Sequence, residues 1–262
     1  MNRIDKKFIQ LKNQNKKAFI AFITAGFPDL STTAKLVIEL EKNGVDIIEL
    51  GVPFSDPLAD GPMIQEASGY SLNQGTNLVK ILDLVKQLRQ TTRLPICLMT
   101  YYNPVFCFGE KNFVDKAVAF GVDGVIIPDL PYEEAKEFRR YANQKGLVNI
   151  CFISPTSSVA RIKAILKVAR GFIYYVSLTG VTGSRKSLDA DLITKLPVIR
   201  KLTTKPVCVG FGISNTRQVK AVRKLSDGVI VGSAIVAKIK ENMGRRNLAQ
   251  RVGSFVGRLS ET

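Results

Sequence analysis

Short apolar runs alternate with longer amphipathic stretches along most of the chain. The runs contain few polar interruptions, which is typical of strands that are buried on both faces of a parallel sheet. Eight strands are predicted in this way, at 19–26, 46–52, 95–102, 124–130, 149–154, 172–177, 206–212 and 228–233. Eight alternating strand and helix units within 262 residues fit an α/β fold, the (β/α)8 TIM barrel.

The amphipathic stretches predict the helices. Residues 77–89 show the pattern most clearly, because apolar residues recur there with helical spacing. Ser31 is a natural N-cap for a helix over Thr32 to Lys42. The other helices between strands are predicted at 112–120, 132–145, 159–169, 188–201, 216–224 and 234–240.

The two ends of the chain extend this pattern. An extra N-terminal helix is predicted within residues 1–16, because Ile4, Phe8 and Leu11 fall on one of its faces. A final amphipathic helix is predicted within residues 244–262. No linker or low-complexity segment interrupts the alternation, so we expect residues 1–262 to form a single domain.

Two connections are enlarged. One follows the second strand and begins at Pro53, and the other follows the sixth strand and covers residues 178–187. In a TIM barrel, the loops that carry function follow the carboxyl ends of the strands. Both enlarged loops should therefore lie over the same mouth of the barrel.

The second strand and its loop hold the most informative polar residues. Glu49 lies inside an apolar run, where a carboxylate without a partner is costly to bury. Asp56 and Asp60 follow on a loop that is stiffened by prolines. This arrangement is typical of an acid–base pair of carboxylates. The alternative is that Glu49 belongs to a structural ion pair and that the aspartates only cap turns.

The composition narrows the choice of chemistry. The chain has no histidine, which removes the usual general base, the usual metal ligand and any Ser-His-Asp triad. The four cysteines form no C-x-x-C pair, so we expect no metal site. No apolar run reaches the ~18 residues of a membrane span, so we expect a cytoplasmic protein with no membrane partner.

The formal net charge of +16 favours an anionic partner or substrate. Lysine and arginine are scattered along the whole chain, without a long basic run that is interleaved with aromatic residues. That distribution argues against nucleic acid. A phosphorylated substrate and an acidic protein surface both remain open.

Glycine clusters follow the late strands, as expected for a phosphate site. They contain Gly183, Gly212 and Gly232, the last followed by Ser233. Exposed backbone N–H groups near a helix N-terminus bind phosphate well, and barrels often place phosphate after strands 7 and 8. Each glycine could instead form a plain turn, which is what we expect of Gly210.

Elimination leaves metal-free acid–base chemistry on a phosphorylated substrate. The predicted strands 6 and 7 contain no lysine for a Schiff base. No G-x-G-x-x-G motif follows the first strand, which argues against a nicotinamide cofactor. Proton-transfer isomerisation and retro-aldol cleavage both remain possible on these grounds.

A family resemblance goes further than this elimination. The sequence ELGVPFSDPLADGP (49–62) strongly resembles the signature of the tryptophan synthase alpha subunit family. The likeness continues over nearly the whole chain, in AFITAGFPD (21–29), MTYYNPV (99–105), IIPDLP (126–131), YYVSLTGVTGSR (174–185), GFGIS (210–214) and DGVIVGSAIV (227–236). The resemblance implies a (β/α)8 lyase of tryptophan biosynthesis. It would cleave indole-3-glycerol phosphate to indole and glyceraldehyde 3-phosphate.

The resemblance also implies roles for individual residues. Glu49 corresponds to the principal acid–base carboxylate, and Asp60 to the carboxylate that binds the indole nitrogen. Tyr174, rather than Tyr175, corresponds to the tyrosine of the site. The remaining implied residues bind substrate: Phe22 and Phe211 line the indole pocket, Thr182 meets Asp60 when the loops close, and Gly183, Gly212, Gly232 and Ser233 hold the phosphate.

A partner is implied in the same way. The family forms an α2β2 heterotetramer with a beta subunit that carries pyridoxal phosphate, and this subunit itself has no cofactor. Asp56 and Pro57 would lie near the interface. Two other hypotheses stay open from the residues alone. One is another phosphate-binding barrel, such as a sugar-phosphate isomerase, and the other is a non-catalytic subunit that activates a beta partner.

Overall fold

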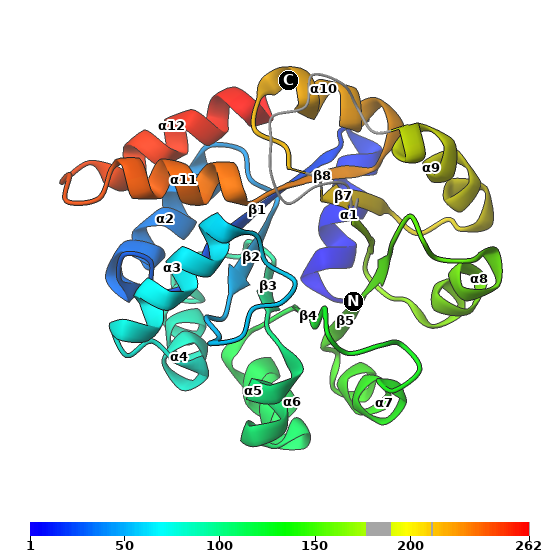
Figure 1. Ribbon diagram of the computed structural model, residues 1–262, viewed down its shortest axis with the longest axis horizontal. Coiled ribbons are helices and arrows are strands. Elements are labelled where there is room, and N and C mark those ends of the chain that lie inside the picture. The colour runs from blue at the N-terminus through cyan, green and yellow to red at the C-terminus, as the bar shows by residue number, and fades with distance from the viewer. Residues whose placement is uncertain (177–189, 211, 262) are drawn as a thin grey trace.

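The predicted barrel is confirmed. The computed structural model describes residues 1–176, 190–210 and 212–261. Eight parallel strands pair in sequence order and close into a barrel (Figure 1). They are β1 (Ala18–Thr24), β2 (Ile47–Gly51), β3 (Ile96–Met99), β4 (Gly124–Ile126), β5 (Val148–Ile153), β6 (Ile173–Val176), β7 (Val207–Gly210) and β8 (Gly228–Val231).

Helices surround the strands (Figure 1). They are α2 (Leu30–Lys42), α3 (Pro62–Asn73), α4 (Leu78–Leu88), α5 (Tyr102–Phe108), α6 (Glu110–Phe120), α7 (Lys136–Lys145), α8 (Val159–Val168), α9 (Ala190–Leu202), α10 (Thr216–Leu225), α11 (Ser233–Glu241) and α12 (Leu248–Ser260). Both α3 and α4 lie between β2 and β3, so the connection after the second strand is enlarged as predicted. The predicted loop 178–187 lies outside the described residues.

The extra N-terminal helix is α1 (Arg3–Asn13), and it covers the amino-terminal end of the barrel. Its buried face holds Ile4, Phe8 and Leu11, as predicted. These side chains pack in one cluster with interior residues of the strands, among them Ile20 and Ile47. Helix α1 therefore seals one end of the barrel and leaves the carboxyl ends of the strands for a site.

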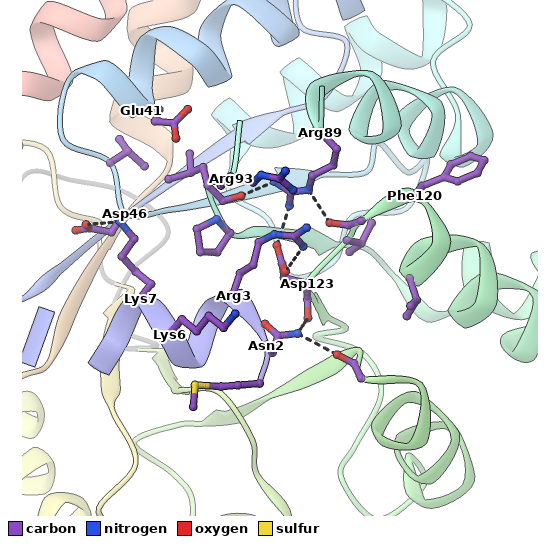
Figure 2. Close-up of a pocket in the computed structure, with 18 of the residues that line it drawn as sticks. Asn2, Arg3, Lys6, Lys7, Glu41, Asp46, Arg89, Arg93, Phe120 and Asp123 are labelled. Carbon is purple, nitrogen blue, oxygen red and sulfur yellow. Dashed lines mark hydrogen bonds and ion pairs between the residues drawn. The ribbon is translucent and has the colours of Figure 1, made fainter. Parts of the chain in front are cut away.

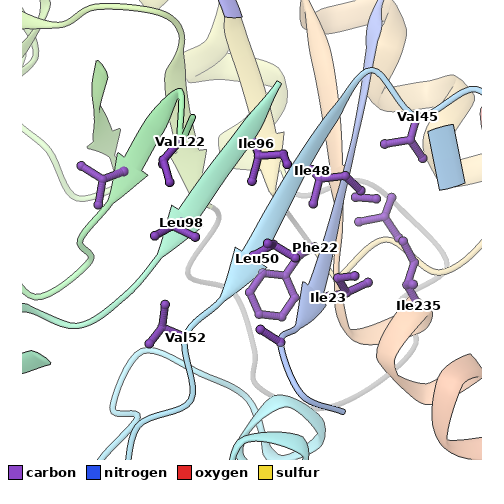
Figure 3. Close-up of a cluster of buried hydrophobic side chains, with 14 of the residues drawn as sticks. Phe22, Ile23, Val45, Ile48, Leu50, Val52, Ile96, Leu98, Val122 and Ile235 are labelled. Atoms are coloured by element: carbon purple, nitrogen blue, oxygen red, sulfur yellow. The ribbon is translucent and has the colours of Figure 1, made fainter. Parts of the chain in front are cut away.

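A second and larger cluster fills the space between the strands and the outer helices. Figure 3 shows part of it, with Ile48 and Leu50 of β2 and Leu98 of β3. In the same view, Ile235 of α11 belongs to this outer cluster. Because residues of one strand alternate between the two clusters, β2 presents Ile47 to the inner cluster and Ile48 to the outer one.

Several boundaries differ from the prediction, among them the strand predicted at 124–130, which ends at Ile126. For two of them the physical reason is clear. The strand predicted at 95–102 ends at Met99, and α5 begins at Tyr102. The Tyr102 N–H donates to the Asp129 carboxylate at 2.9 Å, which caps the new helix. The predicted N-cap Ser31 is also wrong. Asp29 caps α2 instead, and its carboxylate accepts from the Thr32 N–H at 2.7 Å.

Candidate active site

Glu49 is the central polar residue of β2. The strand register aligns it with Phe22 of β1 and Cys97 of β3. Its side chain is fully buried. Neither carboxyl oxygen has a hydrogen-bond partner among the described residues. A buried polar group of this kind is costly to keep unless function requires it.

Burial alone explains the raised pKa of Glu49. Removal of the ionised carboxylate from water raises its pKa from 4.5 to about 8. At neutral pH, this group therefore holds a proton that it can donate to a reacting atom. After donation, the carboxylate can accept a proton in turn, which is the behaviour that acid–base catalysis needs.

The loop after β2 places Asp60 next to an aromatic anchor. The Tyr101 hydroxyl donates to Asp60 Oδ2 at 3.1 Å and accepts from the Ala59 N–H at 2.9 Å. The Tyr101 ring stacks on Phe54, with 5.2 Å between the ring centroids. Within the loop, the Asp60 N–H donates to the carbonyl of Pro57 at 3.0 Å. One tyrosine thus fixes both the backbone and the carboxylate of this loop.

Burial also perturbs Asp60. It raises the pKa of this carboxyl from 3.8 to about 6, and the hydrogen bond from Tyr101 offsets part of the rise. Asp60 is therefore largely ionised at neutral pH while Glu49 is largely protonated. Two carboxyl groups whose environments separate their pKa values are suited to different roles in one reaction.

The sequence reasoning missed Tyr101 as a site residue. Only the motif MTYYNPV (99–105) was noted in this stretch, because nothing local indicates that residue 101 reaches the loop of Asp60. A buried tyrosine usually finds a partner for its hydroxyl, and here the partner lies 41 residues away in sequence.

Glycines in the strands give two aromatic rings their space. A Cβ at Gly51 would lie 2.5 Å from the ring of Phe22, and a Cβ at Gly210 would lie 2.5 Å from the ring of Tyr174. Gly210 ends β7 and pairs with neighbouring strands, so the prediction of a plain turn there is wrong. These two glycines allow Phe22 and Tyr174 to occupy the barrel interior near Glu49.

Tyr174 lies in the same region as both carboxyl groups. Burial raises the pKa of its phenol well above the usual range, and the charges of Glu49 and Asp60 add to this effect. The Tyr174 ring also packs against Phe152, with 4.9 Å between centroids. A neutral phenol in this position can donate a hydrogen bond but does not serve as a base near neutral pH.

The N-terminus of α11 supplies backbone N–H groups to the site. Gly232 is the N-cap residue and Ser233 the first residue of this helix. The first N–H groups of a helix lack intrahelical partners and attract anions. A Cβ at Gly232 would lie 3.3 Å from Phe22, so the helix start lies beside the predicted indole pocket. Gly212 lies between β7 and α10, and nothing would contact a Cβ there within 4 Å.

The structure describes only some of the other predicted site residues. Thr182, Gly183 and Phe211 lie outside the described residues. Asp56 is exposed on the loop after β2, and its carboxylate accepts from the Ser55 hydroxyl at 2.5 Å. Among the described residues, no group of three or more potential ligands could hold a metal ion.

Comparison with known proteins gives a consistent result. A family model described as "Tryptophan synthase alpha chain" matches residues 8–262. The chain is 52% identical over 259 residues to the tryptophan synthase alpha chain of Geotalea uraniireducens, covering 99% of this chain and 97% of that one. It is 44% identical to the corresponding chain of a Thermoanaerobacter species, covering 100% and 99%.

Solved structures agree with the sequence relatives. Tryptophan synthase subunit alpha from Legionella pneumophila superposes with a TM-score of 0.93 at 37% identity, covering 100% of this chain and 98% of that one. A chain of the tryptophan synthase complex from Pyrococcus furiosus gives a TM-score of 0.86 at 36% identity, covering 94% and 98%.

Proposed function

The chain belongs to the tryptophan synthase alpha chain family, and we propose that Glu49 is the acid–base group of its reaction. This lyase of tryptophan biosynthesis cleaves indole-3-glycerol phosphate to indole and glyceraldehyde 3-phosphate. The observation that carries the proposal is the burial of Glu49 without a hydrogen-bond partner among the described residues.

The cleavage requires two proton movements. Protonated Glu49 donates its proton to C3 of the indole ring, which turns the ring nitrogen into a cationic iminium. The resulting carboxylate removes the proton from the adjacent glycerol hydroxyl. The bond between indole C3 and the glycerol carbon then breaks, its electron pair returns to the ring, and the hydroxyl carbon becomes the aldehyde. A pKa of about 8 suits a group that performs both transfers near neutral pH.

Asp60 and Tyr174 support this step. Asp60, whose pKa is about 6, is the ionised partner that accepts a hydrogen bond from the indole N–H and stabilises the positive charge on nitrogen. Tyr101 positions Asp60 through the hydrogen bond between them. Tyr174 donates a hydrogen bond to the substrate while its phenol stays neutral.

The phosphate lies at the start of α11 in this proposal. The N–H groups near Gly232 and Ser233 bind its oxygens, together with Gly212 and Gly183. Phe22 and Phe211 line the pocket of the indole ring. Thr182 meets Asp60 when the loops close, which excludes water from the reaction. For the described members of this set, the position of Phe22 beside Gly232, where an added Cβ would lie 3.3 Å from the Phe22 side chain, supports the arrangement.

The complex partner of the family is the beta subunit. For this chain, we infer an α2β2 assembly in the cytoplasm, in which the beta subunit carries pyridoxal phosphate and receives the indole. Asp56 and Pro57 lie at the interface. The exposure of large apolar side chains supports this placement, since Leu58 next to them is 93% exposed and Phe106 on α5 is 65% exposed. Among the described residues, no helix is long and apolar enough to cross a membrane.

The decisive experiment measures indole release from indole-3-glycerol phosphate by the purified chain, with and without a beta subunit. We expect weak release alone, stronger release with the partner, and none from Glu49→Gln. A variant that keeps more than about a tenth of the wild-type rate would refute the role of Glu49, since acid–base groups contribute ~10²–10⁴-fold. Raised beta-subunit activity without any release would instead indicate the non-catalytic subunit.

A further inference from the structure

A cavity of about 1090 Å³ lies at the amino-terminal end of the barrel, opposite the end that holds Asp60 and the start of α11. Helix α1 forms one wall, and the turns that precede β2, β3 and β4 form the others. We call this cavity the basal groove. Its volume exceeds what a single inorganic ion needs and matches that of a small-molecule site.

The basal groove is rich in positive charge. Six of its lining side chains are cationic and three are acidic. The cationic ones are Arg3, Lys6, Lys7, Lys86, Arg89 and Arg93, and the acidic ones are Glu41, Asp46 and Asp123. Figure 2 shows Arg3, Arg89 and Arg93, which come from different elements, directed towards the region of Asp123.

Asp123 is fully used by the fold. It accepts from Arg3 Nη1 at 2.9 Å and from Arg89 Nη2 at 2.7 Å (Figure 2), and it also accepts from the Ile96 N–H at 2.9 Å. Its side chain is only 3% exposed. This carboxylate therefore has little capacity to neutralise further cations.

The other two carboxylates are engaged as well. Asp46 accepts from the Phe19 N–H at 2.9 Å and lies 3.6 Å from Lys7 Nζ. Glu41 accepts from the Thr92 hydroxyl at 2.6 Å. Each acidic side chain of the groove thus holds a neighbouring part of the chain in place.

Three cations remain without a carboxylate. Among the described residues, Lys6, Lys86 and Arg93 form no ion pair. Lys86 lies over the ring of Phe120 at 5.0 Å. Burial lowers the pKa of Arg89, and the positive charges of Arg3 and Arg93 lower it further, against the attraction of Asp123. An anion in the groove would relieve this repulsion.

Arg89 is held rigidly at the inner wall. Its Nε donates to the carbonyl of Gly121 at 2.8 Å, and Nη1 donates to the carbonyl of Leu94 at 2.6 Å. Gly121 has a φ of 92°, and a Cβ there would lie 2.7 Å from Arg89 Cγ. The wall is therefore built around the guanidinium before any ligand arrives, which lowers the entropic cost of binding.

We propose that the basal groove binds a small organic phosphate. Arg3, Arg93 and Lys6 take the phosphate oxygens, because guanidinium forks and ammonium groups match phosphate in charge and geometry. The organic part rests on the apolar side chains that complete the lining, among them Leu94 and Val122. Nothing in the cleavage of indole-3-glycerol phosphate requires a site at this end of the barrel.

The test uses the complete chain with adenosine 5′-diphosphate and with inorganic phosphate, at constant ionic strength. Calorimetry measures affinity, and NMR of the methyl groups of Leu94, Val118 and Val122 reports where the probe binds. We expect shifts at these methyls and tighter binding of the diphosphate than of phosphate. Absence of these shifts, or equal affinity for the two probes, would overturn the proposal of an organic phosphate.

Matched variants separate the groove from general charge effects. Lys6→Gln with Arg93→Gln removes two unpaired cations of the groove and should weaken binding about tenfold or more. Lys163→Gln with Lys167→Gln removes two exposed cations of α8 and should change affinity by less than about twofold. Equal weakening in both variants would contradict the proposal. Indole release is a separate readout, so failure of either proposal is recognised independently.

Discussion

The two ends of the barrel each hold a buried carboxyl group, and the two groups are treated in opposite ways. Asp123 at the amino-terminal end accepts from two guanidinium groups and a backbone N–H. Glu49, towards the other end, is just as deeply buried and has no hydrogen-bond partner among the described residues. The first carboxylate stabilises the fold, and the second is kept at a cost to the fold.

This contrast separates structural from chemical carboxylates better than burial does. A buried charge that is paired and hydrogen-bonded holds elements together. A buried carboxyl without partners has its pKa raised and is ready to exchange protons with a ligand. Substitutions at the two groups and at their neighbours test whether the groups are as different as their surroundings indicate.

The largest effect is expected for Glu49→Gln, because activity and stability should change in opposite directions. Between pH 4.5 and about 8, the folded wild type binds more protons at residue 49 than the unfolded chain does. Its free energy of unfolding therefore falls as pH rises through this window, by at most about 1.4 kcal/mol per unit. Glutamine cannot titrate, so the variant should lose this slope and be more stable than wild type at pH 8.

Urea unfolding of both proteins at a series of pH values measures that slope. If the two proteins show parallel pH dependence, Glu49 has an ordinary pKa in the folded state and the contrast with Asp123 fails. Activity is measured in parallel, where the loss should reach ~10²–10⁴-fold.

Asp123→Ala should act on stability alone. It leaves Arg89, whose side chain is 10% exposed, without its counter-charge, and breaking a buried pair typically costs about 3–5 kcal/mol. The rate of indole release per folded molecule should stay close to wild type, because Glu49 and Asp60 lie elsewhere.

Asp115→Ala is the matched control for Asp123→Ala. Its carboxylate pairs with Lys145 at 2.7 Å on the surface, so the free energy of unfolding should hardly change. Chemical denaturation of wild type, Asp123→Ala and Asp115→Ala measures the free energy of unfolding of each protein. Equal stability of the two variants would show that the network of Asp123 contributes nothing.

The pH profile of indole release should be bell-shaped. Activity rises as Asp60 ionises, with a limb near pH 6, and falls as Glu49 loses its proton, with a limb near pH 8. Steady-state rates from pH 5 to 9.5 measure both limbs. A profile that stays flat above pH 7 would contradict the protonated state of Glu49.

Tyr101→Phe should give the smallest change, a displacement of the acidic limb of the pH profile. The hydrogen bond from Tyr101 lowers the pKa of Asp60, so its removal should move the acidic limb to higher pH and leave the alkaline limb in place. The maximal rate should fall only a few-fold, because Asp60 is ionised at the pH optimum with or without this hydrogen bond. Displacement of both limbs would indicate a general disturbance of the site instead.

The sequence predicted those features that depend on local pattern. Unbroken apolar runs identify buried strands, and a glutamate within such a run is conspicuous. Both the barrel and the functional importance of Glu49 could therefore be predicted from the sequence. The end of β3 could not be predicted in this way, because the carboxylate of Asp129 that caps α5 lies 27 residues further along the chain.

The same limit applies to the two ends of the barrel. Tyr101 and Asp123 act through partners that are distant in sequence, such as Asp60 and Arg3. In the printed sequence, Asp123 stands before a glycine and looks like an ordinary turn residue. Only the closed barrel brings three donors to it, so pattern analysis had no signal for the structural carboxylate.

The glycines at 51 and 210 have a consequence for protein engineering. Each site already has its free space filled by the ring of a neighbour, Phe22 or Tyr174, and an added methyl group would lie 2.5 Å from that ring. A library of variants that is designed to bind larger or smaller indole analogues should therefore keep both glycines unchanged. It should vary the ring-bearing positions 22 and 174 instead, because the backbone opposite them offers no room to adjust.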